Sequence, residues 1–112
     1  MLPEIRLQIL TLITALLVLP GSCSFFLLDE TPIVFVHGNG DTAAVWHTTM
    51  WRFESNAYPR DYLFAIDFTY PSSLANDAVP EEGRSSTTDQ MNQLSEFVDT
   101  VLAETGKDKV IL

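Results

Sequence analysis

The stretch Ile33-Val34-Phe35-Val36-His37-Gly38-Asn39-Gly40-Asp41 decides how the rest of the chain is interpreted. Residues 33–36 are apolar and mostly β-branched, which is typical of a short strand buried on both faces. Residues 37–41 are polar and include two glycines, so the strand ends there in a loop. In open parallel sheets, functional loops follow the carboxyl ends of strands, and this loop has that place.

The segments that follow this loop alternate between helix and strand patterns. Residues 43–56 have helical composition, residues 62–68 form a second apolar run, and residues 109–112 begin a third. The residues expected on the buried face of the first helix are Val45, Trp46, Met50 and Phe53. This alternation predicts an α/β fold in which a parallel sheet is flanked by helices.

A long loop and the clearest helix separate the second and third strands. Residues 69–84 have no periodicity, and a loop of that length is usually functional or mobile. Thr87 and Gln90 have the pattern of a capping box, and Gly106 is a C-terminal stop. The apolar residues at helical spacing are Met91, Leu94, Phe97, Val98, Val101 and Leu102.

The printed sequence stops inside its third apolar strand. A parallel strand needs neighbours on both sides, and no turn or polar tail follows Leu112. We therefore expect residues 25–112 to be the N-terminal part of a larger domain, with its sheet incomplete at the C-terminus.

The first 24 residues differ in kind from the rest. Residues 7–19 are almost wholly apolar but fall short of the roughly 20 residues of a membrane span. Pro20-Gly21 and small residues follow, so residues 1–24 are expected to be a secretory signal, with an uncleaved membrane anchor as the alternative. Cys23, the only cysteine, is interpreted as a small residue near the cleavage point, or else as a lipid-attachment site. Either way, we expect a secreted, periplasmic or membrane-anchored protein.

Charge bears on which partners the chain can have. The chain has 15 acidic and 6 basic residues, for a net charge of −9. A surface of that sign repels nucleic acid and anionic membranes. We therefore expect no nucleic-acid partner.

The loop at residues 37–41 is compatible with acyl transfer. Such chemistry needs backbone N–H donors aimed at the developing oxyanion. Gly38 permits a sharp turn after the strand, and the next N–H, that of Asn39, can then face a cavity. In α/β-hydrolases one oxyanion donor comes from this loop and the other follows the nucleophile.

The same loop also matches a dinucleotide-binding fingerprint, which gives a second hypothesis. Residues 38–43 match G-x-G-x-x-A, and Asp67 ends the second strand. However, Asp41 would repel a pyrophosphate at the helix N-terminus. Asp67 also lies further from Gly40 than the roughly 20 residues of that fingerprint. The Rossmann-type hypothesis is therefore the weaker one.

Other candidate residues have structural interpretations. His37 is expected to stabilise its loop by side-chain hydrogen bonds, and Asp67 to be a hydrogen-bonding residue at a strand end. His37, His47 and Asp41 match no common metal site, so we expect no metal.

The serines and tryptophans are interpreted in the same way. Gly83-Arg84-Ser85-Ser86 lacks the closing glycine of a nucleophile elbow, so its serines are assigned to helix capping. Trp46 and Trp51 are expected in the core or in a pocket wall.

Three separated blocks of the chain resemble one family. Residues 34–38, with Gly40 and Trp46 beyond them, resemble the oxyanion loop of α/β-hydrolases. Residues 60–68, and residues 101–106 with Lys109-Val110, are similar to class 2 bacterial lipases, which are small and secreted. Plain esterases share the pattern. The resemblance runs from about Pro32 to Leu112 with compatible spacing.

The resemblance implies a three-layer α/β-hydrolase fold and a serine acyl-enzyme mechanism with no cofactor. Asn39 would supply a backbone N–H to the oxyanion hole, within a loop that includes His37, Gly38 and Gly40. The family often has an apolar residue where this chain has Asn39. The elbow serine would follow shortly after Leu112, and the acid and histidine later, so the chain alone is expected to be inactive.

We therefore predict the N-terminal part of an exported carboxylic-ester hydrolase that acts on lipid or other apolar acyl esters. Transient contact with a lipid interface is compatible with such substrates. The alternative is a short non-catalytic binding or interaction module, which the long loop and the acidic surface allow.

Overall fold

The computed structural model describes residues 30–112. The predicted signal or anchor over residues 1–24, including Cys23, lies outside the described residues. Within residues 30–112, no helix has both the length and the apolar composition needed to cross a bilayer.

Two short parallel strands form the centre of the fold. β1 spans Ile33–Phe35 and β2 spans Leu63–Ala65, with Ile33 opposite Leu63 and Phe35 opposite Ala65. Both expected strands are present, and both are shorter than predicted. The second begins late because residues 60–62 form a 3₁₀ turn, η2 (Arg60–Tyr62).

The expected third strand is present as a single parallel bridge on the far side of β1. The Val34 N–H donates to the Ile111 carbonyl at 2.8 Å, and the Ile111 N–H donates to the Pro32 carbonyl at 2.8 Å. β1 therefore lies between β2 and the segment around Ile111. Since all three run parallel, their carboxyl ends meet at one edge of the sheet.

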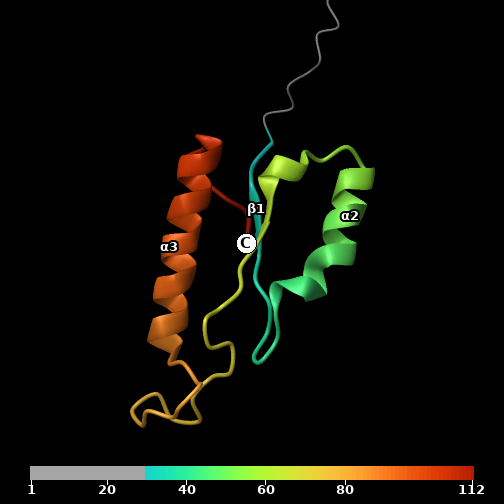
Figure 1. The fold of residues 1–112 in the computed structure, drawn as a ribbon. Helices are drawn as coiled ribbons and strands as arrows, with labels where there is room; N and C mark the ends of the chain where they lie inside the picture. The colour runs from blue at the N-terminus through green and yellow to red at the C-terminus, as the bar shows by residue number, and fades with distance from the viewer. Residues whose placement is uncertain (1–29) are drawn as a thin grey trace, which may run out of the picture.

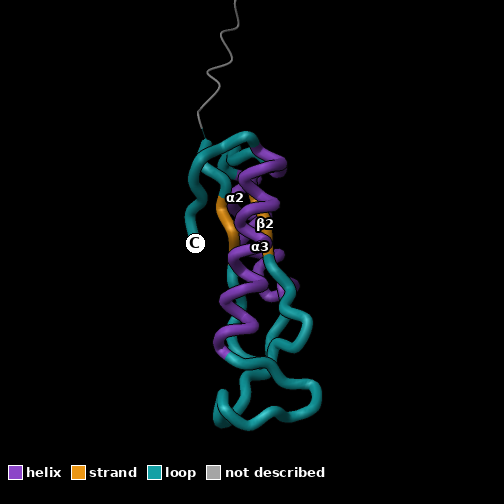
Figure 2. Tube along the Cα trace, turned by 90° about the vertical axis from the view of Figure 1, so that its left-hand side faces the viewer, coloured by secondary structure: helices purple, strands orange, loops and turns teal. Residues whose placement is uncertain are grey.

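Helices flank the strands on both sides, as Figures 1 and 2 show. A 3₁₀ helix, η1 (Ala43–Trp46), leads into α2 (His47–Ser55), and α3 (Thr87–Thr105) precedes the Ile111 segment. β2 and Ile111 lie on opposite sides of β1, so right-handed crossovers place α2 and α3 on opposite faces of the sheet. The predicted α/β arrangement of parallel strands and flanking helices is confirmed.

The core between the sheet and α2 is built from alternate strand residues. Its buried members are Ile33, Phe35, Met50 and Leu63. The Phe35 ring lies 5.4 Å from that of Trp46 and 5.8 Å from that of Phe53, centroid to centroid. Met50, Trp46 and Phe53 therefore face the core as predicted.

Two predictions about this helical segment are wrong. Val45 is 48% exposed and Trp51 is 64% exposed. Residues 43–46 wind at about three residues per turn, so Val45 is rotated off the face that a continuous α-helix would present. Trp51 is adjacent to the buried Met50 and therefore points about 100° away from the core.

The opposite face of the sheet packs on α3. Val34, which alternates with Ile33 and Phe35, is 1% exposed, and so is Val101 of α3. Met91, one of the apolar residues at helical spacing, is 66% exposed. α3 has 19 residues and is about 28 Å long, whereas each strand has three residues and is about 10 Å long. The first turns of α3 therefore extend past the sheet, and Met91 has no strand to pack on.

The ends of α3 are set by local chemistry. Ser86 is the N-cap, and its hydroxyl accepts a hydrogen bond from the Asp89 N–H at 3.1 Å. The predicted capping box of Thr87 and Gln90 is therefore wrong by one residue, because Ser86 keeps the extended backbone that a cap needs. Hydrogen bonds from the Ser86 side chain and backbone lower the pKa of Asp89. Gly106, at φ 67°, ends the helix as predicted.

Tyr58 joins the end of α2 to the start of β1. Its ring packs edge-on against Phe53 at 5.5 Å, and its hydroxyl donates to the Thr31 carbonyl. Burial, and next the charge of Glu30, raise the pKa of Tyr58.

β2 has an open edge that Arg60 covers in part. The Ile66 N–H donates to the Phe35 carbonyl, so by alternation the groups of Leu63 and Ala65 point away from β1. The Leu63 N–H donates to the Arg60 carbonyl, and Arg60 Nη1 donates to the Leu63 carbonyl at 2.8 Å. One residue of this edge is therefore paired by Arg60 instead of by another strand.

Candidate functional site

The loop of residues 37–41 lies at the carboxyl end of β1, which is the lower end in Figure 1. It connects β1 to η1. The carboxyl ends of β2 and of the Ile111 segment face the same edge, because all three run parallel. This edge is where sites gather in parallel sheets.

His37 is held inside the fold at the start of this loop. Its side chain is fully buried, with Nδ1 2.9 Å from the Gly38 carbonyl oxygen and Nε2 3.5 Å from the Phe68 nitrogen. These partners require the tautomer with the proton on Nδ1. The Phe68 ring stacks edge-on at 5.2 Å. His37 therefore stabilises its loop by side-chain hydrogen bonds, as predicted.

Asp67 is a hydrogen-bonding residue at a strand end, also as predicted. Its carboxylate accepts the Ala43 N–H at 2.6 Å and lies 4.0 Å from His37 Nε2. The Asp41 carboxylate accepts the neighbouring Thr42 N–H at 3.0 Å. Two carboxylates thus occupy the N-terminus of η1, where the dinucleotide hypothesis would place a pyrophosphate. That hypothesis loses its anion site.

The two glycines shape the turn itself. The Asp41 N–H donates to the Gly38 carbonyl at 3.2 Å, which closes the turn. Gly40 has φ +74°, a left-handed conformation that side chains rarely adopt. Its N–H donates to the Pro71 carbonyl at 2.9 Å, so the turn is fixed against the loop after β2.

Asn39 is exposed at the tip of the turn. Its side-chain carbonyl accepts the Ser73 N–H at 2.8 Å. Its own backbone N–H has no acceptor among residues 30–112. The loop therefore combines a fixed backbone with a free N–H at the carboxyl edge of the sheet, and the assignment of that N–H to an oxyanion hole stays a prediction.

The loop after β2 contributes a buried group that sequence reasoning missed. Ser85 is 3% exposed and bonds to the segment that contacts Asn39 and Gly40. The prediction that both serines serve in helix capping holds for Ser86 but is wrong for Ser85. The presence of two adjacent serines before a helix that needs one cap was the only sequence signal for the buried position of Ser85.

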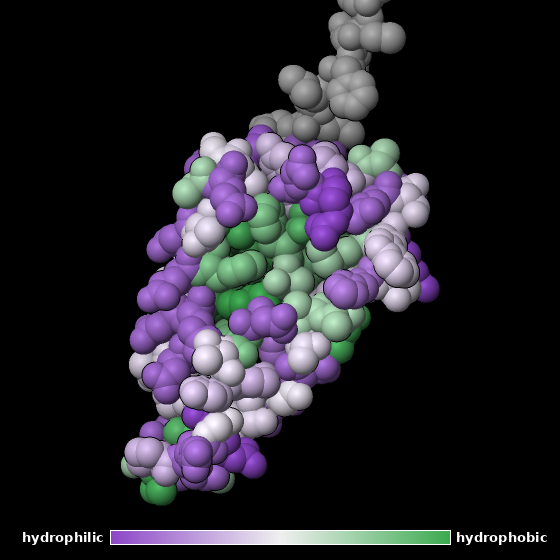
Figure 3. All heavy atoms as spheres, in the orientation of Figure 1, coloured by the Kyte–Doolittle hydropathy of each residue, from purple (hydrophilic) through white to green (hydrophobic). Residues whose placement is uncertain are grey.

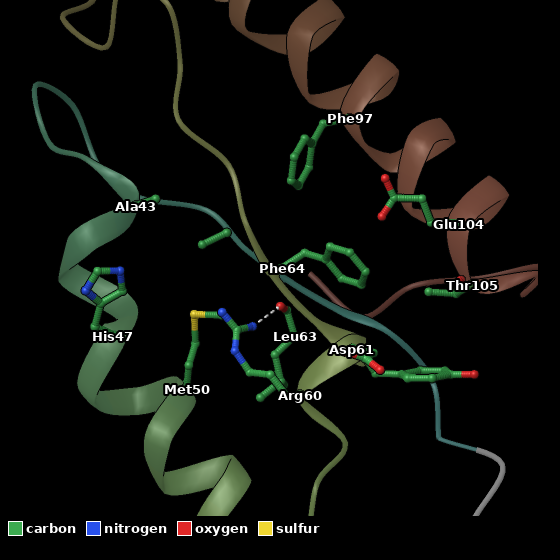
Figure 4. A pocket seen from close by; sticks show the side chains of 12 residues that line it. Ala43, His47, Met50, Arg60, Asp61, Leu63, Phe64, Phe97, Glu104 and Thr105 are labelled. Atoms are coloured by element: carbon green, nitrogen blue, oxygen red, sulfur yellow. Dashed lines mark hydrogen bonds between the residues drawn. The ribbon is translucent and has the colours of Figure 1, made fainter.

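A hollow lies along the open edge of β2, outside the loop of residues 37–41. It has a cavity volume of about 780 Å³ and an apolar floor between α2 and α3 (Figure 3). In Figure 4, Phe64 and Phe97 line it beside the more polar Arg60 and Glu104. It follows the strand edge rather than the carboxyl ends of the strands, so we do not assign the chemistry to it. Within residues 30–112, no cluster of metal-ligating side chains is found there or elsewhere.

Comparison with known proteins identifies a family for this chain. A family model described as Lipase (class 2) matches residues 30–112, which include the loop at 37–41, both strands and α3. No curated protein matches, and no solved structure matches.

Proposed function

The chain belongs to the family of class 2 lipases, and we propose that it forms the oxyanion-loop half of a serine carboxylic-ester hydrolase site. We further propose that the substrates are lipid or other apolar acyl esters and that the protein is exported. No cofactor takes part, because a serine acyl-enzyme mechanism needs only a nucleophile, a base, an acid and oxyanion donors.

The observation that carries this proposal is the free N–H of Asn39 in a loop that is held on both sides. His37 anchors the start of the loop, and Gly40 and the Asn39 side chain bind the segment after β2. A donor that is fixed before the reaction costs no reorganisation when charge develops, which is why such donors accelerate acyl transfer. Removal of one donor of this kind typically lowers kcat by about 100- to 1,000-fold.

The position of Ile111 supports a nucleophile at the same edge of the sheet as Asn39. The segment around Ile111 runs parallel to β1 and directly beside it. A residue that follows this segment would emerge at the same edge as Asn39. In our proposal the elbow serine is there, its acid and histidine come later in the chain, and the sheet extends to the three-layer hydrolase fold.

The proposal is tested on the protein at its full natural length. We expect a fluorophosphonate probe to label one serine and p-nitrophenyl esters to be hydrolysed, while residues 1–112 alone give neither result above background. Absence of labelling and of turnover in the full-length protein would refute the proposal and favour the binding-module alternative.

A further inference from the structure

We infer that Ser85 and Gln90 are positioning residues that hold the Asn39 loop through the segment after β2, an inference that rests on the proposed function. Neither residue is at the tip of the loop. Each acts through hydrogen bonds to residues 70–74, and those residues contact the loop.

The first link joins the loop to this segment. The Gly40 N–H donates to the Pro71 carbonyl at 2.9 Å, and the Ser73 N–H donates to the Asn39 side chain at 2.8 Å. A Cβ on Gly40 would lie 3.6 Å from Ser72 Oγ, so the two loops also touch. Any shift of residues 71–73 therefore moves the backbone on both sides of the Asn39 N–H.

The second link joins the segment to Ser85. The Ser85 hydroxyl donates to the Tyr70 carbonyl at 2.6 Å, and its N–H donates to the Ser72 carbonyl at 3.0 Å. Its carbonyl accepts the Leu74 N–H at 3.0 Å. Ser85 thus bonds to three residues of a segment that has no helix or strand of its own. Because its side chain is buried, water cannot easily replace these bonds.

The third link joins Ser85 to α3, a helix of 19 residues that is capped at both ends. Gln90 Nε2 donates to Ser85 Oγ at 2.9 Å and lies 3.5 Å from Ser73 Oγ. One turn further, the Gln93 side chain accepts the Thr69 N–H at 2.9 Å. Gln90 is in the first turn of this helix, whose Val101 is 1% exposed. The chain of contacts therefore runs from the helix through Ser85 to the proposed oxyanion donor.

If Ser85 and Gln90 position the Asn39 N–H, their replacement should lower kcat and leave substrate binding unchanged. Ser85→Ala removes the bond to Tyr70 and leaves the Gln90 amide only its longer contact with Ser73 Oγ, at 3.5 Å. Gln90→Glu keeps the side-chain shape and removes the donor, so it serves where Ser85→Ala fails to fold. A displaced donor weakens transition-state stabilisation, for which we expect a kcat loss of about 10- to 100-fold with KM within about twofold.

The matched control is Ser95→Ala, which removes an exposed hydroxyl from the same helix. Activity is measured on p-nitrophenyl esters with the full-length protein. Amide hydrogen exchange is followed at Gly40 and Ser73, whose N–H groups make the two loop contacts. We expect exchange at both amides to accelerate at least about tenfold in Ser85→Ala and Gln90→Glu, and to be unchanged in Ser95→Ala.

Unchanged exchange at Gly40 and Ser73 in a folded variant would overturn the inference, and so would an unchanged kcat. If the wild-type protein neither hydrolyses esters nor takes up the phosphonate probe, the proposed function fails. The exchange measurement still decides whether Ser85 holds the loop, so the two failures are distinguishable.

Discussion

Replacement of Val101 by alanine tests whether α3 is packed on the sheet as described. Val101 is 1% exposed and packs on the face of the sheet that presents Val34, also 1% exposed. The substitution removes two buried methyl groups at about 0.8 kcal/mol each and leaves a cavity that the rigid strands cannot fill. We expect the free energy of unfolding to fall by about 2–3 kcal/mol.

Urea denaturation followed by circular dichroism measures this loss as a lower midpoint at unchanged slope. Met91→Ala is the matched control, because Met91 is on the same helix and 66% exposed. It is expected to change stability by less than about 0.5 kcal/mol. Equal effects of the two substitutions, or a Val101→Ala loss below about 0.5 kcal/mol, would refute the account of this interface.

Three other predictions concern exposed or titrating groups. Arg60→Ala uncovers the edge of β2, so we expect faster aggregation by light scattering than for Arg52→Ala, with a stability change under about 1 kcal/mol. Because the pKa of Tyr58 is raised, the folded state keeps the phenolic proton to a higher pH than the unfolded state does. The resulting contribution to the free energy of unfolding is complete below the ordinary pKa of 10.0 and is lost as pH rises through the raised pKa. Tyr58→Phe should therefore flatten the alkaline fall of stability. The lowered pKa of Asp89 stabilises the fold above the ordinary value of 3.8, and this contribution is lost as pH falls through the lowered pKa. Asp89→Asn should flatten the acid side of a plot of the free energy of unfolding against pH. An unaltered alkaline side in Tyr58→Phe, or an unaltered acid side in Asp89→Asn, would contradict the corresponding pKa shift.

The sequence predicted those parts of the fold that depend on local patterns. A short apolar run predicted β1, and a helical period followed by a glycine predicted most of α3. Two glycines predicted the turn at residues 37–41. These features follow from period, turn chemistry and capping, which act within a few residues. The role of His37 was predictable for a similar reason, because one of its partners is the adjacent Gly38 carbonyl.

The errors arise from local backbone geometry at η1 and from packing between distant segments. Val45 is exposed because η1 is a 3₁₀ turn, and Met91 is exposed because α3 extends past three-residue strands. Neither cause is visible in a periodic pattern. The contact between Asn39 and Ser73 joins residues 34 positions apart, and no local rule pairs them. The support of the candidate site by Ser85 is therefore a property of the folded chain alone.

Removal of the Asn39 backbone N–H tests most directly the central claim that this group stabilises the oxyanion. Asn39→Pro removes this N–H, whereas Asn39→Ala keeps it and removes only the side-chain contact with Ser73. In the full-length protein, kcat for p-nitrophenyl esters should fall by about 100- to 1,000-fold in Asn39→Pro and much less in Asn39→Ala. Equal activity of the folded proline variant and the alanine variant would contradict the claim that this N–H stabilises the oxyanion.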